Sequence, residues 1–392
     1  MTLNKSHAIR NTFGYYSQFI CLGLNVGIIG PTIPSLASQT GVTIAAIGGI
    51  FLVSPLGATI GTFLAGKLFD RFKSRHTMLG IAQVVLALMM FLIPLTPFFW
   101  MLLAVNFILG FTNGFINAGS NTLIMWTHDD RSAPFINGLH FFFGLGAFSA
   151  PFLFAILTSH GGTYRGAFWI MAFLSLLSAV YVFSLGKSPG YEHKDEKVSG
   201  NSSMARYLPL IIVAMLYLFF YVGAELTYGG WVFTYVIKLG IANDTEGAFL
   251  TSVFWFSFTA GRLLSIVAAT RLKPQHIIAI SILSCLVILG TLFVLKPTLI
   301  ILWVISAGIG FFMGPLWPSG YTLAGQSVKL TAFSSSIILM GDSIGAMILP
   351  SATGFVLERL GPDIMIKLVF GSLVLTFIAF LAILRERKKL KT

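Results

Sequence analysis

Two long stretches of this chain, residues 11–66 and 76–127, contain no Asp, Glu, Lys or Arg. Only 10% of the 392 residues are charged, 56% are hydrophobic, and the mean hydropathy is +0.87. A segment that crosses the hydrocarbon core of a bilayer needs about 20 mostly apolar residues, so each stretch can hold two spans. This composition excludes an ordinary soluble domain and predicts an integral membrane protein.

Cysteine and catalytic motifs are also scarce. The two cysteines, Cys21 and Cys285, fall inside apolar runs, and the chain has no CxxC or Cys/His spacing, so we expect neither a disulfide framework nor a metal site. No P-loop glycine–lysine motif is present, which argues against a self-contained ATP-driven pump. We therefore expect no enzyme activity and no cofactor other than a coupling ion.

The net charge of +12 does not indicate nucleic-acid binding, because the basic residues lie in short breaks between apolar runs. The apolar periodicity fits an all-α protein with twelve transmembrane helices. The expected spans are 10–34, 45–66, 76–95, 98–125, 135–158, 164–186, 207–236, 247–269, 275–295, 298–324, 333–357 and 364–385. A polar stretch over 187–206 is the linker between an N-terminal six-helix bundle, 1–186, and a C-terminal six-helix bundle, 207–392.

The distribution of basic residues predicts the orientation in the membrane. If both termini are placed inside, 19 of the 25 Lys and Arg residues fall in inside segments and five fall outside. Cytoplasmic loops carry the excess of Lys and Arg, so we expect both termini and the linker in the cytoplasm. Short loops and a short N-terminal segment favour a bacterial inner membrane, and we expect a monomer.

The two halves repeat at a nearly constant offset. A shift of 200 residues aligns Gly61 with Gly261 and Arg71 with Arg271, and it aligns a glycine pair at 110 and 310. A same-topology repeat of six spans predicts a pseudo-two-fold axis along the membrane normal, with the substrate path between the halves.

The segment after the second span reads GKLFDRFKSR over 66–75. It resembles the cytoplasmic loop signature G-x-x-x-D-R-x-x-x-R of the major facilitator superfamily, and that resemblance extends over essentially the whole chain. It implies a transporter that works by alternating access, with Asp70, Arg71 and Arg75 as gating residues at the inner face. The alternative is a solvated turn. The corresponding segment of the second half, 269–273, lacks the acid.

Three further motifs narrow the resemblance within the superfamily. LHFFFGLGA over 139–147 is similar to sodium-dependent glucose transporters, and YVGAE over 221–225 is similar to these and to the fucose and glucose/galactose proton symporters. GRLL over 261–264 fits the same group. The resemblance implies cation-coupled transport of a sugar.

Glu225 is the strongest candidate for an ion-coupling residue. It lies mid-span on the helix face that it shares with Tyr217, Tyr221 and Tyr228, at spacings of four, four and three. Ionisable groups inside a membrane are costly and are functional candidates by default. The carboxyl can accept a proton, a sodium ion or a sugar hydroxyl, or it can be a structural acid bonded to a nearby hydroxyl.

Asp342, flanked by small residues, is the second ion-coupling candidate, and Arg262 is the only basic residue that lies well inside the ends of an expected span. If the two pair directly, they form a structural ion pair, and if they do not, Asp342 belongs to the ion site. Arg262 lies toward the cytoplasmic end of its span, where we assign it to gating or to partial snorkelling.

Asn113, Asn117 and Asn121 form a polar stripe at a spacing of four. Gln18 and Asn25 share a face of the first span, and Asn25 is the repeat partner of Glu225. Amides both donate and accept hydrogen bonds, as sugar hydroxyls do, so we expect these five residues to bind substrate. The alternative is that they join helices, a common role of polar residues in membrane proteins.

Two aromatic residues complete the expected substrate site, Tyr221 and Trp317. A flat indole stacks well on a sugar ring, and Trp317 lies in a span that contains Gly310, Gly314, Pro315 and Pro318. Glycine and proline at these positions predict a bend in a gating helix.

The first functional hypothesis is secondary active symport of a hexose-like small polar solute with H+ or Na+. The second is proton-driven efflux of amphipathic small molecules. A hypothesis of another class is a membrane receptor or lipid-binding protein that keeps the fold without transport.

Overall fold

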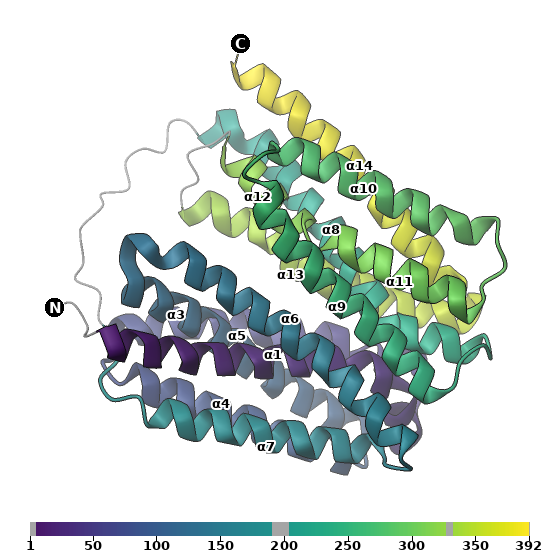
Figure 1. The fold of residues 1–392 in the computed structure, drawn as a ribbon, viewed down its shortest axis with the longest axis horizontal. Coiled ribbons are helices and arrows are strands. Elements are labelled where there is room, and N and C mark those ends of the chain that lie inside the picture. The colour runs from purple at the N-terminus through teal and green to yellow at the C-terminus, as the bar shows by residue number, and fades with distance from the viewer. Residues whose placement is uncertain (1–4, 190–203, 327–331, 392) are drawn as a thin grey trace. The chain divides into compact units, whose positions relative to one another are not determined.

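The computed structural model describes residues 5–189, 204–326 and 332–391, and within these ranges it contains helices and no strand (Figure 1). The α-helices are α1 (Lys5–Thr40), α2 (Ile44–Ile47), α3 (Ile50–Arg71), α4 (Arg75–Leu92), α5 (Phe99–His128), α6 (Ser132–Ser159), α7 (Tyr164–Phe183), α8 (Met204–Lys238), α9 (Asp244–Ala268), α10 (Pro274–Gly290), α11 (Leu299–Met313), α12 (Leu316–Gly325), α13 (Ala332–Leu360) and α14 (Ile364–Lys391). Three short 3-10 helices, η1 (Ile93–Leu95), η2 (Asp129–Arg131) and η3 (Thr291–Phe293), extend helix ends.

Twelve segments of the described chain are long and apolar enough to cross a bilayer, as the sequence predicted. Two of them are made of two helices each: α2 and α3 share Ile44–Phe69, and α11 and α12 share Leu299–Gly325. In hydrocarbon the backbone N–H and C=O groups find no water, so continuous helices satisfy them internally.

The helices are longer than the predicted spans at several ends. The first was expected over 10–34 and runs over Lys5–Thr40, and the last was expected over 364–385 and runs over Ile364–Lys391. Hydropathy detects only the part of a helix that lies in hydrocarbon, whereas backbone hydrogen bonding continues into the polar flanks.

The chain divides into two compact units. Unit 1 contains Met1–His193 and Asn243–Ser252, and unit 2 contains Lys194–Ala242 and Val253–Thr392. Within unit 1, α1 packs along α6 and α4 along α7, and within unit 2, α8 packs along α13 and α14 (Figure 1). Most of the predicted linker, 187–206, lies outside the described residues, so the domain boundaries drawn from the sequence stay a prediction.

In unit 1, glycines bring the backbones of α3 and α5 into contact. A methyl group at Gly61 would overlap the carbonyl oxygen of Phe111, and one at Gly110 would overlap that of Ser54. Small residues at such crossings allow close van der Waals packing, which drives helix association where the surrounding lipid is as apolar as the side chains.

Unit 2 contains the same two contacts at an offset of 200 residues. A methyl group at Gly261 would overlap the carbonyl oxygen of Phe311, and one at Gly310 would overlap that of Phe254. The repeat seen in the sequence is therefore a repeat of backbone crossings, α3 with α5 in one unit and α9 with α11 in the other.

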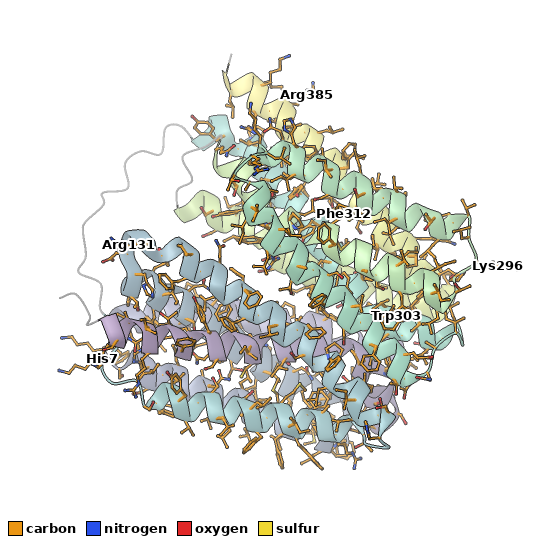
Figure 2. All side chains as sticks on the ribbon, viewed as in Figure 1. His7, Arg131, Lys296, Trp303, Phe312 and Arg385 are labelled. Carbon is orange, nitrogen blue, oxygen red and sulfur yellow. The ribbon has the colours of Figure 1, made fainter. Side chains whose placement is uncertain are left out.

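Labelled basic side chains lie at the ends of the helices (Figure 2). Figure 2 shows His7 and Arg131 at one end of unit 1, and it shows Lys296 and Arg385 at opposite ends of unit 2. The loop charges predict that Arg131 and Arg385 lie inside and that Lys296 lies outside. The side of the membrane that each end faces stays a prediction.

The crossings give a direct test of packing. Gly61→Ala is expected to lower the thermal-denaturation midpoint in detergent, because overpacking of a close contact costs about 1–3 kcal/mol. Gly66→Ala, on the same helix with nothing within 4 Å of the added methyl group, is the matched control. It should leave the midpoint unchanged or raise it, since alanine favours a helix over glycine. Equal midpoints for the two variants would contradict this packing.

Candidate functional site

The tenth span is broken in its middle. Helix α11 ends at Met313 and α12 begins at Leu316, with Gly314 and Pro315 between them. Pro318 has no N–H, so the Gly314 carbonyl loses the donor that a regular helix would supply four residues later. The predicted bend in this span is confirmed, and it leaves carbonyl groups that need other donors.

Tyrosines of α8 donate hydrogen bonds to two carbonyls beside the break. The Tyr217 hydroxyl donates to the Leu316 carbonyl at 3.0 Å, and the Tyr221 hydroxyl donates to the Met313 carbonyl at 2.9 Å. The two rings stack with centroids 6.4 Å apart and planes inclined by 22°. The tyrosine face of α8, which the sequence spacing predicted, therefore lies against the helix break.

Glu225, one turn beyond Tyr221 on α8, is buried with 9% of its surface exposed. Its carboxyl interacts with the Tyr221 side chain and lies within electrostatic range of Arg262 and Asp342. The alternative to an ion-coupling role for Glu225 is a structural acid bonded to a nearby hydroxyl. The interaction with Tyr221 is compatible with both roles.

Arg262, on α9, lies near both acids and bonds to neither directly. Its Nε donates to the Gly314 carbonyl at 3.4 Å, and its guanidinium carbon lies 4.6 Å from the centroid of the Phe258 ring. It acts electrostatically on the carboxyls of Glu225 and Asp342, yet among the described side chains it forms no salt bridge with them. The direct ion pair considered for Arg262 and Asp342 is absent from this part of the chain.

Asp342, on α13, interacts with the side chain of Trp317 on α12. The Trp317 ring also stacks on Tyr321, with centroids 5.6 Å apart and planes inclined by 13°. One face of the indole is therefore covered within unit 2, and the other face is the one that a sugar ring could use. The role of Trp317 as a sugar platform stays a prediction.

Counting formal charges gives this cluster an excess of one negative charge. The ionised carboxyls of Glu225 and Asp342 contribute two negative charges, and the guanidinium of Arg262 contributes one positive charge. An unbalanced charge inside a membrane protein is costly, so one bound monovalent cation or proton would neutralise the cluster. Chemically, the cluster is suited to take up a single cation.

The asparagine stripe lies on α5 in unit 1. The Asn121 Nδ2 donates to the Asn117 Oδ1 at 2.7 Å and to the Asn117 carbonyl at 3.0 Å, and this pair is exposed. The Asn113 Oδ1 is buried and has no hydrogen-bond partner among the described residues. By contrast, the Asn106 amide donates to the Leu102 carbonyl of its own helix at 2.8 Å.

Gln18 is tied into the interior of unit 1. Its Nε2 donates to the Leu79 carbonyl and to the Gln83 Oε1, both at 3.4 Å, and its Oε1 accepts from the Ser120 hydroxyl at 3.0 Å. Both ends of the amide therefore join α1 to α4 and α5, which is the alternative role expected for such residues. Asn25 is buried, with 2% of its surface exposed.

Comparison with known proteins identifies the family of this chain. Residues 16–350 match the family model of the Major Facilitator Superfamily. The chain belongs to the Major Facilitator Superfamily. It is therefore an integral multi-pass membrane transporter of a small molecule and not an enzyme.

Curated relatives show which members of the superfamily the chain is similar to. The chain is 30% identical over 401 residues to sodium-dependent glucose transporter 1A of Mus musculus, over 93% of this chain and 94% of that protein. It is 29% identical to sodium-dependent glucose transporter 1 of Homo sapiens, over 93% of this chain and 77% of that protein. These are the transporters that the motifs over 139–147 and 221–225 resemble.

Solved structures show the same fold. The crystal structure of the nucleoside transporter NupG has a TM-score of 0.76 at 16% identity, over 96% of this chain and 99% of that chain. A bacterial homologue of the human lysosomal transporter Spinster, inward-facing and unoccupied, has a TM-score of 0.70 at 15% identity, over 99% of each chain. At these identities the likeness concerns the fold alone.

Arg75, the last arginine of the loop signature, holds two segments of unit 1 together. The Arg75 Nε donates to the Phe69 carbonyl at 2.8 Å, and its Nη1 donates to the Pro189 carbonyl at 3.0 Å. Its guanidinium carbon lies 4.7 Å from the centroid of the Trp126 ring. Arg75 thereby joins the end of α3 to the segment after α7.

The other two signature residues are less constrained by the described contacts. Arg71 is exposed, with its guanidinium carbon 5.6 Å from the centroid of the Phe72 ring. The side chain of Asp70 lies outside the described residues. The gating roles of Asp70, Arg71 and Arg75 stay predictions.

Sequence reasoning missed His76, which follows the signature directly. Its Nε2 lies 2.7 Å from the Tyr15 hydroxyl, and its Nδ1 lies 3.2 Å and 3.1 Å from the Leu185 and Gly186 carbonyls. His76 thus links α4 to α1 and to the end of α7. A histidine at the start of an otherwise uncharged span was the available signal.

The geometry of Arg75 predicts that lysine cannot replace it. Arg75→Lys keeps the charge and loses the planar fork that reaches both carbonyls, and hydrogen bonds to charged groups contribute about 1.5–3 kcal/mol. We expect a lower thermal-denaturation midpoint for Arg75→Lys and an unchanged midpoint for Arg71→Lys, the exposed control. If Arg71→Lys lowered the midpoint as much as Arg75→Lys, the two carbonyl contacts of Arg75 would not account for the loss of stability.

Proposed function

We propose that this protein is a secondary active transporter that couples entry of a hexose-like solute to H+ or Na+ by alternating access. The observation that carries the proposal is the cluster of Glu225, Arg262 and Asp342 beside the break of the tenth span. The names of the relatives, sodium-dependent glucose transporters, support the sugar and the cation.

The excess negative charge of the cluster supports coupling to one monovalent cation per cycle. Glu225 is the proposed primary ion-coupling residue, because it is the more buried of the two acids and interacts with Tyr221. Asp342, which interacts with the Trp317 side chain, is the proposed second member of the ion site. Coupling follows if cation and solute each favour the same conformational state.

The polar residues of unit 1 support a polyhydroxyl substrate. Asn117 and Asn121 present an exposed amide pair, and Asn113 has a buried carbonyl oxygen with no described partner. Amide groups both donate and accept, so they match the alternating donors and acceptors of a sugar. We propose that this stripe binds the solute hydroxyls.

Orientation, membrane and oligomeric state belong to the same proposal. The excess of Lys and Arg in the expected inside segments supports cytoplasmic termini and, with the short loops, a bacterial inner membrane. One chain carries both repeats, so the proposed working unit is a monomer.

The proposal predicts concentrative uptake that depends on Glu225. Sodium and proton gradients are imposed separately on proteoliposomes. One of the two gradients should drive accumulation of labelled glucose, and it identifies the coupling ion. Glu225→Gln should abolish accumulation and retain exchange of labelled for unlabelled glucose, because the neutral amide mimics the carboxyl with its charge removed. Glu386→Gln makes the same chemical change near the end of α14, where Glu386 pairs with Lys389, and should transport as wild type.

The outcomes separate the alternatives. If the folded protein accumulates no glucose under either gradient, the proposal of glucose import is refuted. Binding of glucose without uptake would indicate a receptor, and movement of amphipathic compounds out of the vesicles under a proton gradient would indicate an exporter.

The asparagine stripe predicts an effect on the KM for glucose. Asn117→Ala removes amide hydrogen bonds to the solute and should raise KM about 3- to 10-fold, since one such bond contributes about 0.5–1.5 kcal/mol. Asn106→Ala is the control on the same helix, because its amide already bonds to Leu102. An unchanged KM in Asn117→Ala would refute the substrate role of this position.

A further inference from the structure

The Tyr221 hydroxyl is bonded to the helix break, and Tyr221 lies one helical turn before Glu225 on α8. It donates to the Met313 carbonyl at 2.9 Å, and its side chain also interacts with the Glu225 carboxyl. A tyrosine hydroxyl carries one proton, so it can donate fully to only one of these groups at a time. Tyr221 is completely buried, so no water competes for that proton.

Arg262 is a second group that acts on both Glu225 and the helix break, through a guanidinium with several N–H donors. Arg262 acts electrostatically on Glu225, and its Nε donates to the Gly314 carbonyl. Met313 and Gly314 are adjacent residues at the break between α11 and α12. Both donors near the carboxyl therefore also hold consecutive carbonyls of the broken helix.

We propose that Tyr221 is a positioning residue that transmits the charge state of Glu225 to the break between α11 and α12. This proposal rests on the proposed function and adds the residue through which the cation acts on a helix.

The physical reason is the difference between neutral and charged acceptors. A hydrogen bond to a carboxylate is roughly twice as strong as one to a neutral carbonyl. When Glu225 is ionised, it draws the Tyr221 proton and the Arg262 guanidinium toward itself and away from Met313 and Gly314. When a cation neutralises Glu225, the donors favour the carbonyls of Met313 and Gly314, to which they are bonded in this structure.

The groups facing Glu225 are Tyr221 on its own helix, Arg262 on α9 and Asp342 on α13. Asp342 contributes a second negative charge, and none of its described interactions is with Tyr221. The break is thus a two-state element that the charge of Glu225 biases, which is the requirement for coupling between an ion site and a moving helix.

Tyr217 provides a matched control. It lies one turn before Tyr221, stacks on it, and donates to the Leu316 carbonyl on the other side of the break at 3.0 Å. Its described contacts do not include Glu225. Tyr217→Phe therefore removes one hydrogen bond to the break without removing the link to the carboxyl.

The first experiment reports on α12 without using glucose. Thr322 is exposed on α12, so the variant Thr322→Cys carries a thiol there, and its labelling rate with a fluorescent maleimide is measured in detergent. The native cysteines Cys21 and Cys285 are buried and contribute little background. Rates are compared with and without NaCl at fixed pH, and at pH 6 and pH 8 without Na+, against free cysteine labelled under the same conditions.

We expect the labelling rate of Thr322→Cys, corrected for free cysteine, to change at least about threefold when the cation is added, because both donors of the break change partner. Adding Tyr221→Phe to this parent variant should abolish the change, and adding Tyr217→Phe should retain it. An unchanged cation response with Tyr221→Phe, or no response in the parent variant, would overturn the proposal.

A second variant covers the case in which Tyr221→Phe does not fold. Glu225→Gln retains the hydroxyl partner and removes the charge, so its labelling rate should stay at the cation-loaded value under all conditions. A cation response that persists in Glu225→Gln would overturn the proposal independently.

Transport measurements separate this proposal from the proposed function. Tyr221→Phe should lose accumulation, whereas Tyr217→Phe should accumulate. If the parent variant shows the cation response but transports no glucose, the sugar function fails and the role of Tyr221 stands. If Tyr221→Phe accumulates glucose as the parent does, the role of Tyr221 fails and the sugar function stands.

Discussion

The structure depends on one constraint: every backbone polar group inside the hydrocarbon needs a partner within the protein. Continuous helices meet it over most of the twelve spans. The tenth span does not, because Pro318 removes a donor and leaves the Gly314 carbonyl without its helical partner. Side chains of α8 and α9 then bond to the carbonyls around the break. These side chains also surround the acids, so a requirement of folding places the ionisable residues beside the break in a helix.

The helix crossings follow from the same surroundings. Lipid tails offer no hydrophobic gain for joining two apolar helices, so close backbone contact has to supply the attraction. Gly61 against Phe111 and Gly261 against Phe311 meet this need at matched positions in the two units. A side chain at any of these glycines would separate the helices. This is why the internal repeat is most visible in the sequence at glycines, while the neighbouring lipid-facing residues differ.

Much of the fold could be predicted from the sequence, because hydropathy and helix periodicity are local properties. The twelve spans and the bend near Gly314 are of this kind, and so is the shared face of Tyr221 and Glu225, which follows from their spacing of four. The partners of Gln18 on two other helices could not be predicted, since they depend on packing between distant segments. The acceptor of Arg262 could not be predicted for the same reason. The helix ends were placed too short, because hydropathy is blind to helical turns outside the hydrocarbon.

The cluster of two acids and one base, Glu225, Asp342 and Arg262, has an energetic consequence for a cell if it binds one cation per cycle. A carrier that moves one cation with each neutral solute also moves one net charge, so the electrical potential across the membrane becomes a driving force. At a potential of 100 mV, one elementary charge is worth about 2.3 kcal/mol. That energy corresponds to an accumulation of the solute of about 50-fold, even where the cation concentrations on the two sides are equal. The single uncompensated carboxylate would thus make uptake responsive to the electrical state of the cell.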